Sequence, residues 1–223
     1  MDAITFNDFN NHKIKESEVI KRILGGEKEL YEILVRRNNQ KLYRIVRTYL
    51  KDEAEIEDIM QNCYLKAFAK LDQFKLDSSF STWLIRIGIN ESLARLKEKG
   101  KMFYLNKPSD HLKSNSILEI PDNKQLNPQD KMIRNEENQL LVNAIDSLEA
   151  KYKVIYVMKE VEGMSLKEVA IVLDLTVANV KIRLHRSKEM LKKKLYEVVN
   201  EKNVFEFGFS RCDRITENVM KLI

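Results

Sequence analysis

The stretch SLKEVAIVLDLTVANVKIRLHRSKEML, residues 165–191, decides the fold because it contains two short helices joined by a tight turn. Ser165 and Glu168 have the spacing of a capping box, in which a serine accepts a backbone hydrogen bond and a glutamate returns one. They predict a helix over residues 166–173. Asp174 to Thr176 is only long enough for a turn, whose threonine can cap a second helix.

The second helix is polar and basic on one side. Val177, Val180 and Leu184 are expected to point inward. The side chains that it presents are Asn179, Lys181, Arg183, His185, Arg186 and Lys188. Two short helices and a tight turn, with a basic second helix, are typical of a helix-turn-helix and its recognition helix. The alternative is an ordinary helical bundle with a solvated basic face.

Composition is compatible with a cytoplasmic protein that contacts nucleic acid. The 223 residues are 43% hydrophobic and 33% charged, and the net charge is only +5, so a DNA-binding field must come from local clustering. Cys63 and Cys212 give neither a zinc cluster nor a redox motif, and Cys63 lies on an apolar helix face. Residues 1–15 lack the apolar core of a signal peptide, and no apolar run is long enough for a membrane span.

The chain divides into two helical blocks, a linker and a tail, so the expected fold is all-α. Residues 16–101 form the first domain, with helices expected over 27–51, from 52 to about 74, and over 80–99. Residues 102–134 contain all three prolines and are expected to form a flexible polar linker. The second small helical domain, 135–199, has further helices from about 136 and over 151–162, and contains the helix-turn-helix. Residues 200–223 are a C-terminal extension.

The helix from residue 52 has a stripe suited to docking. Asp58, Gln61 and Leu65 share one side by their spacing of three and four residues. A stripe that is both apolar and polar can dock on a partner helix. The alternative is a solvated helix edge.

Residues 79–90, SFSTWLIRIGIN, place aromatic residues beside hydroxyls, an arginine and an amide, and basic residues follow. Aromatic rings stack on unpaired bases, and lysine and arginine follow the phosphates of a single strand. The alternative is that Trp83 is simply a core aromatic of the bundle.

In this order, the segments resemble the extracytoplasmic-function (ECF) group of bacterial RNA polymerase sigma factors, from about residue 18 to 198. The resemblance is carried by Glu57-Asp58-Ile59-Met60-Gln61, Tyr64 to Ala67, Phe80 to Ile87, Asn90, Asn127-Pro128, Leu148 with Tyr152, and the helix-turn-helix with Arg186. It implies a first domain that binds core polymerase and melts the downstream promoter element, and a second domain that reads the upstream element.

The resemblance also implies three groups of site residues. The upstream element would be bound by Thr176, Asn179, Lys181, Ile182, Arg183, His185 and Arg186. The downstream element would be bound by Phe80, Ser81, Trp83, Arg86 and Asn90. Core polymerase would be bound by Asp58, Gln61, Asn62 and Leu65. No catalytic residue, metal or cofactor is implied.

The expected linker suits two separated promoter elements. About 17 base pairs at ~3.4 Å each separate the elements by roughly 60 Å. A linker of about 33 residues can extend to roughly 100 Å at ~3.3 Å per residue. It can therefore bridge both sites.

The chain departs from the family pattern at several positions. The turn before the recognition helix usually reads Pro-x-Gly-Thr-Val, whereas residues 176–180 here read TVANV. Asn62 replaces a residue that is usually acidic, Ile182 a small polar residue, and His185 an aromatic one. We therefore expect its upstream element to differ from the commonest one.

Two other functions remain open at this stage. A transcription regulator independent of polymerase could use the same helix-turn-helix, but it explains residues 80–90 poorly. An all-helical enzyme is disfavoured because no paired carboxylates, Cys/His dyad, phosphate loop or metal-ligand spacing is visible.

In the C-terminal extension, Phe205, Phe207 and Phe209 share one side if this segment is extended. The extension either packs on the second domain or docks an anti-sigma or recruiting protein.

Overall fold

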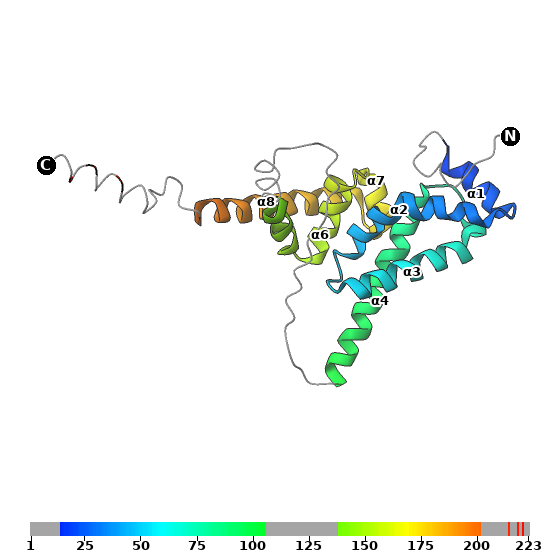
Figure 1. The fold of residues 1–223 in the computed structure, drawn as a ribbon, viewed down its shortest axis with the longest axis horizontal. Helices are drawn as coiled ribbons and strands as arrows, with labels where there is room; N and C mark the ends of the chain where they lie inside the picture. The colour runs from blue at the N-terminus through cyan, green and yellow to red at the C-terminus, as the bar shows by residue number, and fades with distance from the viewer. Residues whose placement is uncertain (1–13, 106–137, 202–213, 215–217, 219, 221–223) are drawn as a thin grey trace.

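The computed structural model describes residues 14–105, 138–201, 214, 218 and 220. Helices account for its regular structure, and the described residues contain no strand. The first domain has helices α1 (Glu16–Leu24), α2 (Tyr31–Val46), α3 (Glu53–Ala69) and α4 (Phe80–Leu105), with 3-10 turns η2 (Lys28–Leu30) and η3 (Leu71–Gln73). The second has a helical segment over 138–146, α6 (Ala150–Tyr156), a π-helical turn η4 (Val157–Val161), α7 (Leu166–Leu173) and α8 (Val177–Glu201). Figure 1 shows the two groups side by side. The all-α prediction with a helix-turn-helix is confirmed.

Side-chain caps begin three of these helices where the sequence predicts. At α3, the Glu55 amide donates to the Asp52 carboxylate at 3.0 Å. At α7, both halves of the capping box form between Ser165 and Glu168, at 3.2 and 2.7 Å. At α8, the Asn179 amide donates to the Thr176 hydroxyl at 3.2 Å. Each cap satisfies an amide that the first turn of a helix leaves unpaired.

Other helix boundaries differ from the prediction. The helix expected over 27–51 is only α2, because η2 precedes it and i→i−3 bonds from Thr48 and Tyr49 end it. The Thr48 hydroxyl also donates to the Ile45 carbonyl at 2.7 Å, which competes with the regular helical bond. The helix expected to reach residue 74 ends at Ala69, where η3 follows.

Three further features were not predicted. Helix α1 buries Val19, Ile20 and Ile23, an apolar spacing of one, three and four residues that could have revealed it. Helix α4 continues to Leu105, past the expected domain end at 101. Val177, which was expected to point inward, is exposed.

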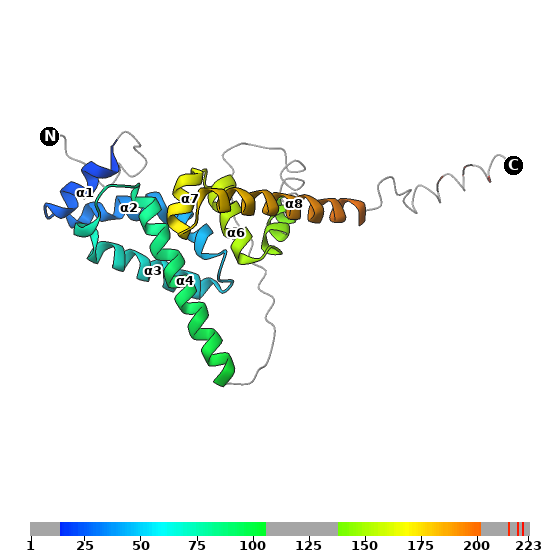
Figure 2. The same cartoon turned by 180° about the vertical axis from the view of Figure 1, so that it is seen from behind.

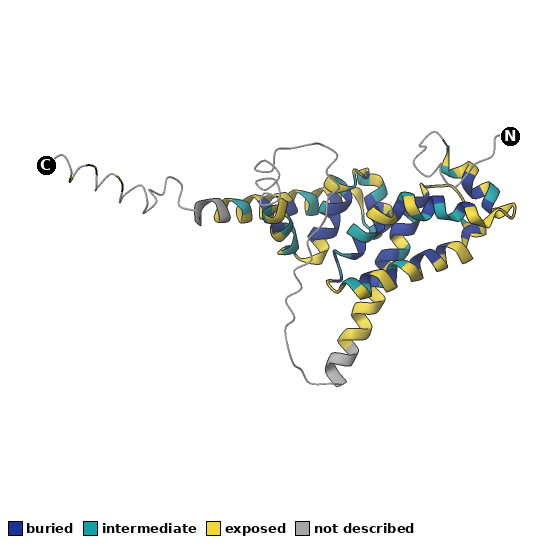
Figure 3. Cartoon of the chain, viewed as in Figure 1, coloured by how far each residue is buried: buried dark blue, intermediate teal, exposed yellow. Residues whose placement is uncertain are grey.

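The two domains share part of their apolar core. Ile45 of α2 and Ile85 and Ile89 of α4 are buried in one cluster with Val154, Ile155 and Met158 of the second domain. Figures 1 and 2 place α7 beside the N-terminal half of α4, and Figure 3 shows buried residues continuing across this junction. Beyond this junction α4 projects away, and its residues 93–100 are exposed. Within the described ranges, no helix is long and apolar enough to cross a membrane.

Candidate nucleic-acid and polymerase interfaces

The outer face of α8 gathers most residues predicted to read the upstream element. Val180, Ser187 and Leu191 turn into the protein and are buried. The predicted readers on the remaining surface are Thr176, Asn179, Lys181, Ile182, His185 and Arg186, which are exposed, and Arg183, which is half-buried. Lys188 pairs with Glu160 at 2.9 Å. The face is therefore mainly polar and basic, and it is open to solvent.

Helix α4 positions the residues predicted to read the downstream element, and they differ in accessibility. Arg86 and Asn90 are exposed. Ser81 is half-buried, and its hydroxyl forms a 2.9 Å hydrogen bond with the Ser79 hydroxyl. Trp83 is half-buried, with its ring 5.1 Å from that of Phe74.

Phe80 departs from the expectation that it holds a flipped base. Its side chain is only 1% exposed and makes edge-to-face contacts with Tyr31 and Phe74 at centroid distances of 6.5 and 6.1 Å. Such contacts are typical of core aromatics. Phe80 therefore has the role of core aromatic that the sequence left open for Trp83. In this conformation its ring has no face open to a base.

The stripe on α3 is accessible along its length. Asp58, Gln61, Asn62 and Leu65 are all exposed, and the Leu65 side chain is 68% exposed. Asp58 and Asn62 also line a groove between α3 and α4, opposite Glu91 and Arg95. The α4 side of this groove was not predicted, because only the packing of the two helices brings it there.

Arg95 and Lys99 of α4 form ion pairs with α3 beside this groove. Arg95 lies 3.4 Å from the Glu55 carboxylate, and Lys99 also pairs with that carboxylate. Both pairs join α3 to α4. The Arg95 and Lys99 side chains are about half exposed, although that of Glu55 is only 16% exposed, so water weakens both pairs and each contributes modestly to stability.

Comparison with known proteins identifies both blocks. The model of sigma-70 region 2 matches residues 34–102, and the model of sigma-70 region 4 matches residues 138–191. Together they cover more than half of the chain. The chain belongs to the sigma-70 family of RNA polymerase sigma factors.

Relatives place this sigma factor in the ECF group. It is 28% identical to the ECF RNA polymerase sigma factor SigW of Bacillus subtilis (strain 168) over 80% of this chain and 96% of that protein. It is 26% identical to the ECF RNA polymerase sigma-E factor of Escherichia coli (strain K12), over 85% of this chain and 98% of that protein. It is therefore a promoter-recognition subunit that binds core RNA polymerase and starts transcription.

Solved structures share its fold. One is the sigma factor RpoE of Bartonella quintana, in complex with the anti-sigma factor NepR, with 21% identity, a TM-score of 0.58, and coverage of 74% of this chain and 96% of that one. Another is CnrH in complex with the cytosolic domain of CnrY, with 21% identity, a TM-score of 0.53, and coverage of 83% and 97%. A transcription regulator that works without polymerase would not need sigma-70 region 2, so the match to this region disfavours that alternative.

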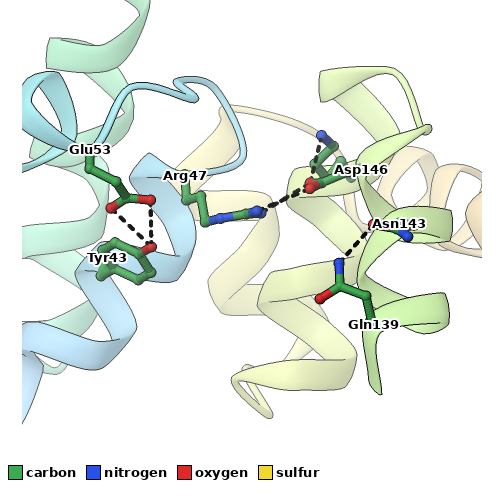
Figure 4. A network of polar contacts seen from close by, with 7 residues as sticks. Tyr43, Arg47, Glu53, Gln139, Asn143 and Asp146 are labelled. Carbon is green, nitrogen blue, oxygen red and sulfur yellow. Dashed lines mark hydrogen bonds and ion pairs between the residues drawn. The ribbon is translucent and has the colours of Figure 1, made fainter. Parts of the chain in front are cut away.

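The two regions of this sigma factor are joined by ion pairs that sequence reasoning missed (Figure 4). Arg47, the C-cap residue just after α2, donates to both carboxylate oxygens of Asp146, each at 3.1 Å, and Lys153 lies 3.3 Å from the same carboxylate. Arg44 lies 2.8 Å from Glu162, whose side chain is 3% exposed. The partners in the Arg47–Asp146 and Arg44–Glu162 pairs are 99 and 118 residues apart in sequence, so no local pattern could have revealed these two pairs.

Burial and charge act in opposite directions on the Asp146 carboxyl. Burial raises its pKa, but the hydrogen bonds and charge of Arg47, with the charge of Lys153, outweigh burial and hold the pKa below the ordinary value. For Lys153, burial is the largest cause and lowers the pKa; Asp146 raises it, but the charges of Lys51 and Arg47 lower it further, so the pKa lies below the ordinary value. Asp146 therefore stays ionised between the two cations at neutral pH.

Proposed function

We propose that the outer face of α8 reads the upstream promoter element in duplex DNA. The supporting observation is that the capped helix-turn-helix leaves this polar, basic face open, with the residues near its N-terminal end exposed. In this motif the N-terminal part of the second helix contacts base edges in the major groove. Arg186 is the candidate for a forked contact with guanine, a contact worth ~1–3 kcal/mol.

Replacing Arg186 tests this assignment. Arg186→Ala is expected to lower holoenzyme affinity for the promoter about 5- to 150-fold and to relax preference at one base position. Lys193→Ala is the matched control, because Lys193 is exposed further along the same helix. Equal weakening on every sequence would make Arg186 a phosphate contact instead.

We propose that the exposed face of α4 holds the melted strand of the downstream element. Arg86 and Asn90 are accessible for this role, while Ser81 and Trp83 are half-buried at the N-terminal end of the same helix. Trp83→Ala is expected to reduce open-complex formation more than closed-complex binding. A circular dichroism melt checks folding, and an unfolded variant would make Trp83 a core aromatic like Phe80.

We propose that the α3 stripe of Asp58, Gln61, Asn62 and Leu65 docks on core polymerase. Its largest support is Leu65, an apolar residue that is 68% exposed in the described chain. The double variant Gln61→Ala with Leu65→Ala is expected to lose holoenzyme formation while remaining folded. Wild-type affinity for core polymerase would place the docking surface elsewhere.

The domain boundaries and remaining partners follow from these assignments. We propose a polymerase-binding and melting domain at 16–101 and an upstream-reading domain at 135–199, acting in the cytoplasm, where the bacterial polymerase works. The polymerase supplies the chemistry, so this subunit contributes no catalytic residue. An anti-sigma or recruiting protein is proposed for the extension, 200–223, which lies outside the described residues apart from 200, 201, 214, 218 and 220.

A further inference from the structure

Ile182 is an apolar side chain in the middle of the polar reading face of α8. It is 54% exposed. Val180 and Leu184, two residues away on either side, turn into the protein, so Ile182 stands on the opposite side of the helix. Its neighbours one turn away, Ala178 and Arg186, are exposed too.

An isoleucine at this place has one apolar partner available in duplex DNA. Every group that base pairs present in the major groove is a hydrogen-bond donor or acceptor, except the C5 methyl group of thymine. Isoleucine has neither donor nor acceptor to offer. Ile182 is the sixth residue of α8, in the part of a recognition helix that meets base edges.

We propose that Ile182 determines specificity by packing against the methyl group of a thymine in the upstream element. This inference rests on the proposed role of α8 and adds the base that Ile182 selects. The contact buries a methyl group on each side and needs no rearrangement of the helix.

A promoter library with and without thymine methyl groups tests this contact. Holoenzyme containing the full chain selects from a library randomised over both promoter elements, amplified once with thymidine and once with deoxyuridine in its place. Pairing is unchanged, and only the C5 methyl groups are lost. Wild-type protein is expected to enrich thymine at one upstream position. In the deoxyuridine library this enrichment should fall about fourfold, because burying one methyl group is worth ~0.8 kcal/mol and ~1.4 kcal/mol corresponds to a tenfold change in affinity.

Ile182→Ala should enrich thymine in both libraries only as weakly as wild-type protein does in the deoxyuridine library, because it removes the side chain that packs against the methyl group. Ile171→Ala is the matched control, since Ile171 is 57% exposed on α7 and not on the reading face. Thymine enrichment that survives either deoxyuridine or Ile182→Ala overturns the proposal. A profile with no preferred base at any upstream position would overturn the reading role of α8 itself.

Discussion

Gly88 shows how one residue sets the distance between two helices. It is buried in the middle of α4, where glycine costs ~1 kcal/mol relative to alanine. A β-carbon at this position would lie only 2.7 Å from Cδ1 of Leu42, which is fully buried in α2. The close approach of α2 to α4 therefore depends on the absence of a side chain.

Gly88→Ala is expected to lower stability despite its better helix propensity. Overpacking a core typically costs ~1–3 kcal/mol, which exceeds or offsets the gain of about 1 kcal/mol. Urea unfolding of the free protein measures the difference. Adding Leu42→Ala to Gly88→Ala should remove the clash, so the two substitutions should cost less together than the sum of their separate losses. Strict additivity would show that Leu42 does not resist the new methyl group.

Cys63 is buried beside this contact and should be inert in the folded protein. Burial is the main cause that raises the pKa of its thiol to about 12, and the charge of Glu91 adds to it. The thiolate that reacts with alkylating reagents is therefore scarce at pH 8, and the sulfur is enclosed. In a Cys212→Ser background, iodoacetamide should modify Cys63 only after denaturant is added. Rapid modification without denaturant would indicate that the α2–α3–α4 core opens readily.

At the scale of elements, local signals predicted helix starts better than helix ends. The caps at Asp52, Ser165 and Thr176 were read correctly because each depends on residues within three positions of the helix start. The ends of α2 and α3 depend on 3-10 turns shaped by packing. The burial of Phe80 had no local signal, since a phenylalanine beside serines looks the same whether its partner is a core or a base.

The capping box of α7 should contribute measurably to the stability of the helix-turn-helix. Ser165→Ala removes the acceptor for the Glu168 amide, and such losses cost ~0.5–2 kcal/mol. Thermal unfolding of the free protein should show a lower midpoint. Ser165→Asp keeps an oxygen acceptor and should stay near wild type. If both variants lose the same stability, the serine is needed for something other than the cap.

At the scale of the whole molecule, the shared core makes the two domains one cooperative unit. Ile45, Ile85 and Ile89 are buried together with residues of α6 and α7, so neither domain completes this core alone. The site predicted from sequence was a set of separate surfaces, each assigned to its own domain. The junction between them could not be predicted, because it joins residues from opposite sides of the expected linker.

Substitution at the junction should therefore split the unfolding of the protein. Wild-type protein is expected to melt in one calorimetric transition. Ile89→Glu places a carboxylate at a position that is 4% exposed in the shared cluster, and burial of an unpaired charge is costly enough to separate the domains. The melt should then resolve into two transitions, one for each domain. Leu93→Glu, one turn further along α4 and already exposed, should keep the single transition. A single transition for Ile89→Glu at the wild-type midpoint would mean that the domains do not share stability through α4.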